Sequence, residues 1–220
     1  MTAVNWSSFL QYRSNVVRFV LLAAFTLLLL YSFAQFMVWN ETRSAPVLND
    51  FILNYITPID LSKYISTLTL IPIFAGQVYL FRLPEKAVEV LYATIFICLF
   101  RTMTLYLFPL DPPITIISLT DPVIEELFYA GNRLNKDLFF SGHTANLVLI
   151  GLLLENKILK TILFIFAVIV GAMLMMQHVH YSVDVFFAPP FAWFSYKLSL
   201  WATKSTFIFK HVVSKFNKYA

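Results

Sequence analysis

Six apolar segments separated by polar stretches dominate this chain. With 59% hydrophobic residues, 13% charged residues and a mean hydropathy of +0.73, the chain is far more apolar than a soluble domain of 220 residues. An α-helix needs about 20 apolar residues to cross a bilayer. The segments therefore predict an all-α, polytopic membrane protein with about six transmembrane helices, at residues 16–39, 66–81, 87–108, 144–154, 158–177 and 181–200.

Two of the six segments are irregular. The fourth is short and needs Phe139 and Phe140, or a tilt, to reach across the membrane. Pro189 and Pro190 lie inside the last segment and are expected to kink or break it, because neither can donate a helical hydrogen bond. No internal repeat or linker divides the chain, so residues 1–220 are predicted to form one membrane-embedded domain with its core at about 58–200.

The first segment has two interpretations. Arg13 and Arg18 precede it, and Ser32-Phe33-Ala34 resembles the small-residue cleavage site of a signal peptide. The apolar stretch nevertheless continues to Trp39, which favours an uncleaved membrane anchor.

The basic residues are distributed unevenly between the two sides of a six-helix topology. Four of them fall on one side, at Arg43, Lys63, Arg133 and Lys136, and Arg101 lies within a helix. The other eleven are Arg13, Arg18, Arg82, Lys86, Lys157, Lys160, Lys197, Lys204, Lys210, Lys215 and Lys218. Because basic residues concentrate on the cytoplasmic side, both termini are predicted to be cytoplasmic, and the loops at 111–141 and 178–180 face outward. The net charge of +4 forms no continuous patch, so no nucleic-acid partner is expected.

Two histidines and one aspartate lie at the edges of apolar segments, near the expected membrane surface, in Ser141-Gly142-His143-Thr144 and His180-Tyr181-Ser182-Val183-Asp184. Ionisable groups are costly there, although ordinary interfacial polar residues remain the alternative. Asp184, one helical turn after His180, can orient the imidazole and stabilise its cation. His180 then suits the nucleophile of a phosphoryl transfer and His143 the acid, while Ser141 and the backbone near Gly142 could hold phosphate oxygens at a helix N-terminus. The predicted catalytic residues are therefore His143, His180 and Asp184.

These motifs resemble those of the sphingomyelin synthase family, within the type 2 phosphatidic acid phosphatase superfamily. The resemblance is carried by Asp137-Leu138-Phe139-Phe140-Ser141-Gly142-His143-Thr144 and His180-Tyr181-Ser182-Val183-Asp184-Val185, with weaker matches at Arg101-Thr102-Met103-Thr104-Leu105-Tyr106 and Pro58-Ile59-Asp60. It implies six helices with cytoplasmic termini, an outward-facing His/His/Asp triad and a phospho-histidine intermediate. It also implies transfer of a phosphocholine- or phosphoethanolamine-like group to ceramide or diacylglycerol without a metal or other cofactor. The membrane would be a bacterial inner membrane, or a Golgi or plasma membrane.

The chain also departs from the family patterns. Phe108-Pro109-Leu110-Asp111 replaces the usual threonines and Leu-Pro after the arginine, and Asn135-Lys136 stands where the synthases have Cys-Gly. The phosphatase branch normally has a lysine followed by Arg-Pro and a Ser-Arg pair before the second histidine. No Arg-Pro occurs here, and Leu174 is the sixth residue before His180. These motifs favour the synthase branch.

Substrate contacts are predicted at Arg101, Tyr106, Asp137, Ser141 and Gly142. Arg101 lies inside an apolar segment and should pair with an anion, either a substrate phosphate or a carboxylate such as Asp60 or Asp137. Asp137 could orient a histidine or a cationic head group, and packing at the interface is the default role of Tyr106. A zinc site at His143, His178 and His180 is disfavoured because no HxxxH motif is present.

The combined prediction is a phosphotransferase that moves a phospho-head group between lipids at the outer leaflet. One alternative is a lipid phosphate phosphatase that uses the same triad with water as the acceptor. Another is a small transporter or channel whose buried Arg101, His143 and Asp184 line a path for ions, for which inverted repeats would be expected and are not seen. The expected partners are phospholipid and lipid-alcohol substrates and the bilayer. The single cysteine, Cys98, rules out an internal disulfide, and the oligomeric state stays open.

Overall fold

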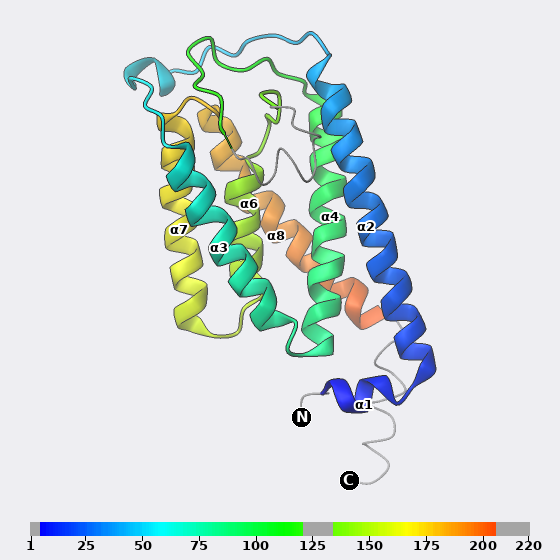
Figure 1. Ribbon diagram of the computed structural model, residues 1–220. Helices are drawn as coiled ribbons and strands as arrows, with labels where there is room; N and C mark the ends of the chain where they lie inside the picture. Colours follow the sequence, from blue (N-terminus) through cyan, green and yellow to red (C-terminus); the bar gives the residue numbers. More distant parts are fainter. Residues whose placement is uncertain (1–4, 121–133, 206–220) are drawn as a thin grey trace.

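The computed structural model describes residues 5–120 and 134–205. Within these ranges the protein is all-helical, with seven α-helices, one 3₁₀ turn and no β-strand. Six long helices run alternately up and down to form a bundle, and the short α1 lies across one end of it (Figure 1). The elements are α1 (Trp6–Leu10), α2 (Arg13–Glu41), η1 (Leu53–Tyr55), α3 (Ser62–Leu80), α4 (Pro84–Leu107), α6 (Gly142–Leu153), α7 (Lys157–Met176) and α8 (Ser182–Ser205).

Every apolar segment of the sequence is helical, but the helices differ in how well they suit a membrane. Three are both long and apolar enough to cross one, namely α2, α4 and α7. The helix α6 has only 12 residues, and α3 and α8 are long enough but less apolar. The all-helical class is therefore confirmed and three helices indicate a membrane protein, whereas six membrane crossings remain a prediction.

The core of the bundle lies among α3, α4, α6, α7 and α8. Small residues let the helices approach closely: Ala188 and Ala192 of α8 are fully buried, and Gly76 of α3 faces Ile150 of α6. The helix α2 packs mainly on α4 and exposes large apolar side chains such as Leu21 and Leu27. Such an apolar exterior is the surface that lipid chains cover.

The two prolines of α8 do not break it. The helix runs unbroken from Ser182 to Ser205 with Pro189 and Pro190 inside it, so of the expected kink or break the break is wrong and the kink stays a prediction. Proline removes the donor to the carbonyl four residues earlier, but a helix packed against neighbours on several sides can retain its course. Here α8 packs against α4 and α6 along its length, and Ala188 and Ala192 on either side of the prolines are fully buried.

The bundle has two distinct ends. The N-termini of α6 and α8 lie at the same end, beneath the loops that follow α2 and α4, whereas α1 and the C-terminal part of α8 lie at the other (Figure 1). Both sequence motifs are thus brought to one end, called the site end below. Which end faces the cytoplasm is still a prediction, and Arg133, Lys210, Lys215 and Lys218 of the charge count lie outside the described residues.

Candidate active site

His180 and Asp184 form a buried pair at the N-terminus of α8. His180 Nδ1 lies 3.1 Å from Asp184 Oδ2, and the two residues are 1% and 0% exposed. His180 precedes the helix and Asp184 lies in its first turn. A carboxylate at Nδ1 favours the tautomer with the proton on Nδ1. The lone pair of His180 is then on Nε2, the nitrogen that can attack an electrophile.

Asp184 also joins the two sequence motifs. Its Oδ2 accepts the N–H of Tyr181 at 3.0 Å, and its Oδ1 accepts the N–H of Phe139 at 3.0 Å. Its backbone carbonyl accepts the N–H of Ser141 at 2.9 Å. Buried polar atoms need such partners, and these donors satisfy both carboxylate oxygens and the carbonyl of Asp184. The same residue that orients His180 therefore fixes the segment that leads into α6.

The segment before α6 has an unusual backbone. Phe139 and Phe140 have φ angles of 66° and 63°, a left-handed conformation that bulky residues rarely adopt. Ring stacking holds both in place, since Phe139 lies 4.9 Å from Phe108 and Phe140 lies 4.5 Å from Phe191 between ring centroids. These two residues bend the chain directly before the N-cap of α6.

Ser141 is the N-cap of α6. Its Oγ accepts the N–H of Thr144 at 3.3 Å, and the side chain is fully buried. The predicted helix start at this motif is confirmed, because α6 begins at Gly142 and places the half-buried His143 in its first turn. The helix N-terminus supplies backbone donors and a positive partial charge at this point.

Arg101 approaches α6 so closely that a Cβ atom at position 142 would overlap its Nη1, and any other residue there would have to displace the arginine. Of the two carboxylates that the sequence offered as partners, Arg101 pairs with Asp137, through Nη2 and Oδ1. Asp60 instead accepts from Ser62. Arg101 belongs to α4 and is buried, and its guanidinium also lies over the rings of Phe33 and Phe140.

Asp137 lies within electrostatic reach of both histidines. Burial raises the pKa of its carboxyl, but the charge and hydrogen bond of Arg101, together with the two histidines, hold the pKa below its usual value of 3.8. Of the two histidines, His180 lowers this pKa more than His143 does. Arg101, Asp137, His143 and His180 therefore share one electrostatic environment, which the sequence motifs alone could not establish.

Tyr106 contacts a different part of the molecule. It is 58% exposed, its ring stacks on Trp39 at 6.4 Å, and the Arg43 guanidinium lies 5.3 Å from the ring centroid. Both partners belong to the end of α2 or the residues just after it. The contacts seen for Tyr106 in the described part of the chain involve α2 rather than the histidines, so its predicted role at the substrate stays untested.

Sequence reasoning missed the residues that hold the loops at the site end. Asp50 Oδ2 accepts the N–H of Ser182 at 2.6 Å, while its Oδ1 accepts the N–H groups of Ile52 and Leu53. The hydroxyl of Tyr181 donates to the carbonyl of Asp111 at 2.8 Å and accepts the N–H of Leu48 at 3.1 Å. In the sequence, Asp50 looks like any other aspartate of a loop, and no motif marks it as a residue that holds the site end together.

His178 and Gln177 hold another loop in place. His178 is 3% exposed, and its Nδ1 lies 2.6 Å from Thr115 Oγ1. Gln177 Nε2 donates to Ser62 Oγ and to the carbonyl of Ile117, at 2.8 and 3.1 Å. In residues 5–120 and 134–205 no group of three or more histidine, cysteine, aspartate or glutamate side chains is arranged to hold a metal ion.

Residues 136–211 match the family model described as PAP2 superfamily C-terminal. The match supports the type 2 phosphatidic acid phosphatase superfamily. It spans His143, His180 and Asp184, and membership of this superfamily fits a lipid phosphatase or a phosphotransferase. No curated protein matches the chain significantly.

Proposed function

We propose that this protein is a membrane phosphotransferase that moves a phosphocholine- or phosphoethanolamine-like group from a phospholipid to a lipid alcohol such as ceramide or diacylglycerol. The observation that carries the proposal is the buried contact of 3.1 Å between His180 Nδ1 and Asp184 Oδ2, next to the segment that opens α6. A nucleophile oriented by a carboxylate, beside a helix N-terminus and an arginine, is the arrangement that phosphoryl transfer needs.

The reaction would proceed in two displacements on phosphorus. In the first, the Nε2 lone pair of His180 attacks phosphorus, the bond to the glycerol oxygen breaks, and His143 protonates the departing alkoxide. In the second, His143 removes the proton of the lipid alcohol, whose oxygen attacks phosphorus and breaks the P–N bond. Asp184 stabilises the cationic imidazole throughout. Arg101, the hydroxyl of Ser141 and the α6 N-terminus would hold the non-bridging oxygens.

The charge balance of the site favours a phosphodiester substrate. The positive charge of Arg101 is opposed by Asp137, and Asp184 adds a second carboxylate beside His180. A dianionic phosphomonoester would therefore meet little net positive charge, whereas a monoanionic diester needs less. This balance supports a phospholipid with a phosphodiester head group as the donor, rather than phosphatidic acid, which is a phosphomonoester.

Burial of His180 and Asp184 supports a lipid acceptor over water. His180 and Asp184 are almost completely covered, and Phe139 stacks between Phe108 and Phe187 at centroid distances of 4.9 and 5.7 Å. A site that excludes water slows hydrolysis of a phospho-enzyme, while an apolar surface positions an alcohol with long chains. Hydrolysis by the same triad is the competing outcome, because the family match fits either reaction.

The deciding assay supplies head-group-labelled phospholipid in liposomes containing EDTA, with and without ceramide or diacylglycerol. We expect a new labelled lipid that depends on the acceptor, and little free phospho-head group. Release of inorganic phosphate from phosphatidic acid, with no product for any acceptor, would assign the protein to the phosphatases instead. Complete loss of activity in EDTA would show that the reaction needs a metal ion.

We further propose that the site end faces away from the cytoplasm, in keeping with the distribution of basic residues. Single cysteines introduced into a Cys98→Ser background test this orientation. The substitution removes the one native cysteine, which is buried in the bundle. Thr57→Cys lies exposed at the site end, and Glu85→Cys lies exposed in the first turn of α4 at the other end. An impermeant maleimide should label Thr57→Cys in intact cells and Glu85→Cys only after permeabilisation, and the reverse pattern would refute this orientation.

A further inference from the structure

Two apolar grooves run along α3 at the end of the bundle remote from the triad. One, of about 390 Å³, lies between α3 and α7, where Ala75 and Tyr79 face Leu159, Leu163 and Phe166. The other, of about 400 Å³, is lined by Phe74, Gln77, Val78, Phe81 and Arg82. Large apolar side chains along both grooves are exposed, among them Phe74 and Val78. On a membrane-embedded bundle such grooves suit acyl chains.

Val78 and Arg82 form the ridge between the grooves, because both residues line both of them. They are four residues apart, so they lie on the same face of α3 and the turn that follows it. Arg82 stands at the end of this ridge with its guanidinium 5.3 Å from the ring centroid of Tyr79. Two chains that straddle the ridge would therefore bring their common head group to one cation.

A third, more polar cavity lies beside Arg82. It measures about 280 Å³ and is lined by Tyr79, Leu80, Arg82, Leu83, Lys86 and Glu155. Lys86 Nζ is shared between two carboxylates, those of Glu89 and Glu155, each at 3.0 Å. Lys86, Glu89 and Glu155 together carry a net charge of −1. The side chain of Glu155 is 78% exposed. The cavity thus presents a cation, Arg82, and an anionic group, Glu155, to the same space.

We propose that this region binds a diacyl phospholipid with a primary ammonium head group, of the phosphatidylethanolamine type. The two acyl chains occupy the grooves on either side of Val78, the phosphate binds Arg82, and the ammonium binds Glu155. Guanidinium–phosphate and ammonium–carboxylate contacts are both charge-assisted hydrogen bonds. A trimethylated choline group has no N–H donor for Glu155, and an anionic head group would be repelled by it.

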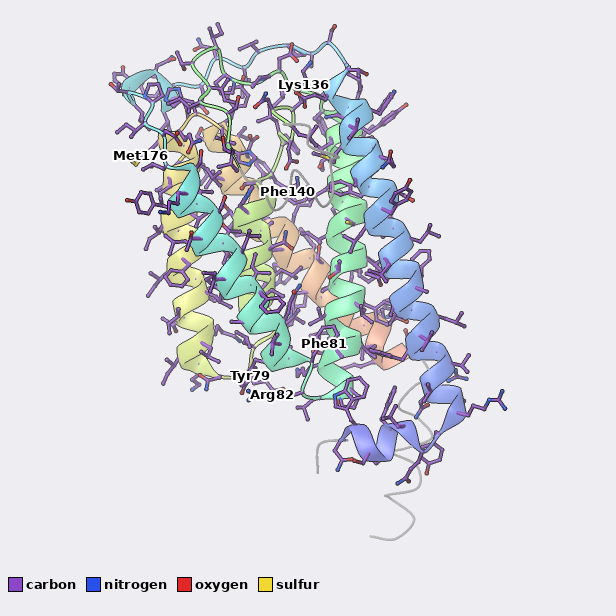
Figure 2. The ribbon with its side chains drawn as sticks, viewed as in Figure 1. Tyr79, Phe81, Arg82, Lys136, Phe140 and Met176 are labelled. Atoms are coloured by element: carbon purple, nitrogen blue, oxygen red, sulfur yellow. The ribbon has the colours of Figure 1, made fainter. Side chains whose placement is uncertain are left out.

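This lipid site is separate from the triad. Tyr79, Phe81 and Arg82 lie at the end of the bundle opposite Lys136 (Figure 2), whereas the site end holds His143 and His180. The bound lipid is therefore structural and does not depend on the proposed reaction. It would fill the outer face of α3, which packs against α6 and α7.

Native mass spectrometry of the purified, delipidated full chain tests the proposal. The His180→Ala variant serves as the parent protein, so that no lipid is consumed at the triad. Phosphatidylethanolamine, phosphatidylcholine and phosphatidylglycerol with identical acyl chains are offered in equal amounts. We expect about tenfold preferential retention of phosphatidylethanolamine, equivalent to the loss of one charge-assisted contact in the competitors. The same lipid should raise Tm more than the others.

Two variants separate the two contacts. Arg82→Gln should remove one bound phospholipid of any head group, whereas Glu155→Gln should keep the bound lipid but abolish the preference for ethanolamine. Lys197→Gln is the matched control, because Lys197 also lies over aromatic rings, at 5.5 Å from the centroid of Trp193, but lines none of these three cavities. Preference for phosphatidylglycerol, equal retention of all three lipids, or an equal loss in Lys197→Gln would overturn the proposal.

Discussion

The two ends of the bundle are held together by different kinds of contact. At the end remote from the triad the connections are short and their caps are local: Asn156 caps α7 through Ile158 and Leu159, and Pro84 begins α4. The ion pair between Lys86 and Glu155 links two of these connections. At the site end, hydrogen bonds join residues far apart in sequence, such as Phe139 to Asp184 and Ser182 to Asp50. Loops that carry function on a rigid scaffold are commonly fixed in this way. The difference predicts that substitutions at the site end act on activity, and those at the other end on stability.

The largest effect is expected for His180→Ala and Asp184→Asn. Each should lower turnover by about a thousandfold or more while the protein stays folded, because one removes the nucleophile and the other its orienting carboxylate. Transfer is measured in liposomes, and folding by circular dichroism and elution from a sizing column. Wild-type turnover in folded His180→Ala would falsify the nucleophile assignment.

The variant His143→Ala sharpens this prediction. An acid matters less when the departing alcohol is already acidic, so the loss should be smallest for donors with a good leaving group. A series of phosphodiesters with leaving groups of decreasing pKa provides the measurement. An equal loss across the series would exclude His143 as the acid and leave its role to be found elsewhere.

The same contrast explains how much the sequence could predict. The helices were predictable because each depends on a local apolar run, and so was the start of a helix beside His143. The pairing of Arg101 with Asp137 was one of three choices, beside Asp60 and a substrate phosphate, since a sequence does not fix distance across 36 positions. The roles of Asp50 and Phe139 were not predictable, because a loop carboxylate and a left-handed phenylalanine acquire meaning only from Ser182, Asp184 and the surrounding rings.

Glycine substitutions compare the two ends directly. Gly142→Ala must displace Arg101 from the α6 N-terminus, since the new Cβ would overlap Nη1. We expect transfer to fall by about a hundredfold with little change in Tm, because the arginine side chain can move aside whereas its position is needed for reaction. Gly76→Ala places a Cβ 2.5 Å from Ile150 Cγ2 in the packed core. It should lower Tm and leave the turnover of the folded fraction near that of the wild type.

Equal losses of turnover in the two glycine variants would contradict the division between the ends. Both variants are compared at matched concentrations of folded protein, determined by elution from a sizing column. Arg101→Lys provides a further check, because it keeps the charge but loses the planar fork that holds two oxygens at once. Its loss of turnover should approach that of Gly142→Ala.

The smallest effect concerns the stability of the ion pair at the site end and its dependence on pH. The pKa of Asp137 lies below its usual value of 3.8, because the charge and hydrogen bond of Arg101, with smaller contributions from His180 and His143, together outweigh the effect of burial. A carboxyl whose folded pKa is depressed binds fewer protons in the folded state, so its contribution to stability is complete above about 3.8 and is lost as the pH falls through the folded value. Asp137→Asn should therefore be destabilised by about 2 kcal/mol at pH 7.

This destabilisation should vanish in acid, because protonated Asp137 resembles asparagine. Melting curves of wild type and Asp137→Asn in detergent are expected to keep a constant difference from pH 7 to about pH 5 and to converge below about 3.8. A double-mutant cycle with Arg101→Gln and the double variant isolates the interaction between Asp137 and Arg101. The coupling energy of this pair should show the same dependence on pH as the destabilisation. A coupling energy that stays constant down to pH 3 would mean that Asp137 and Arg101 contribute to the site end through packing and not through their charges.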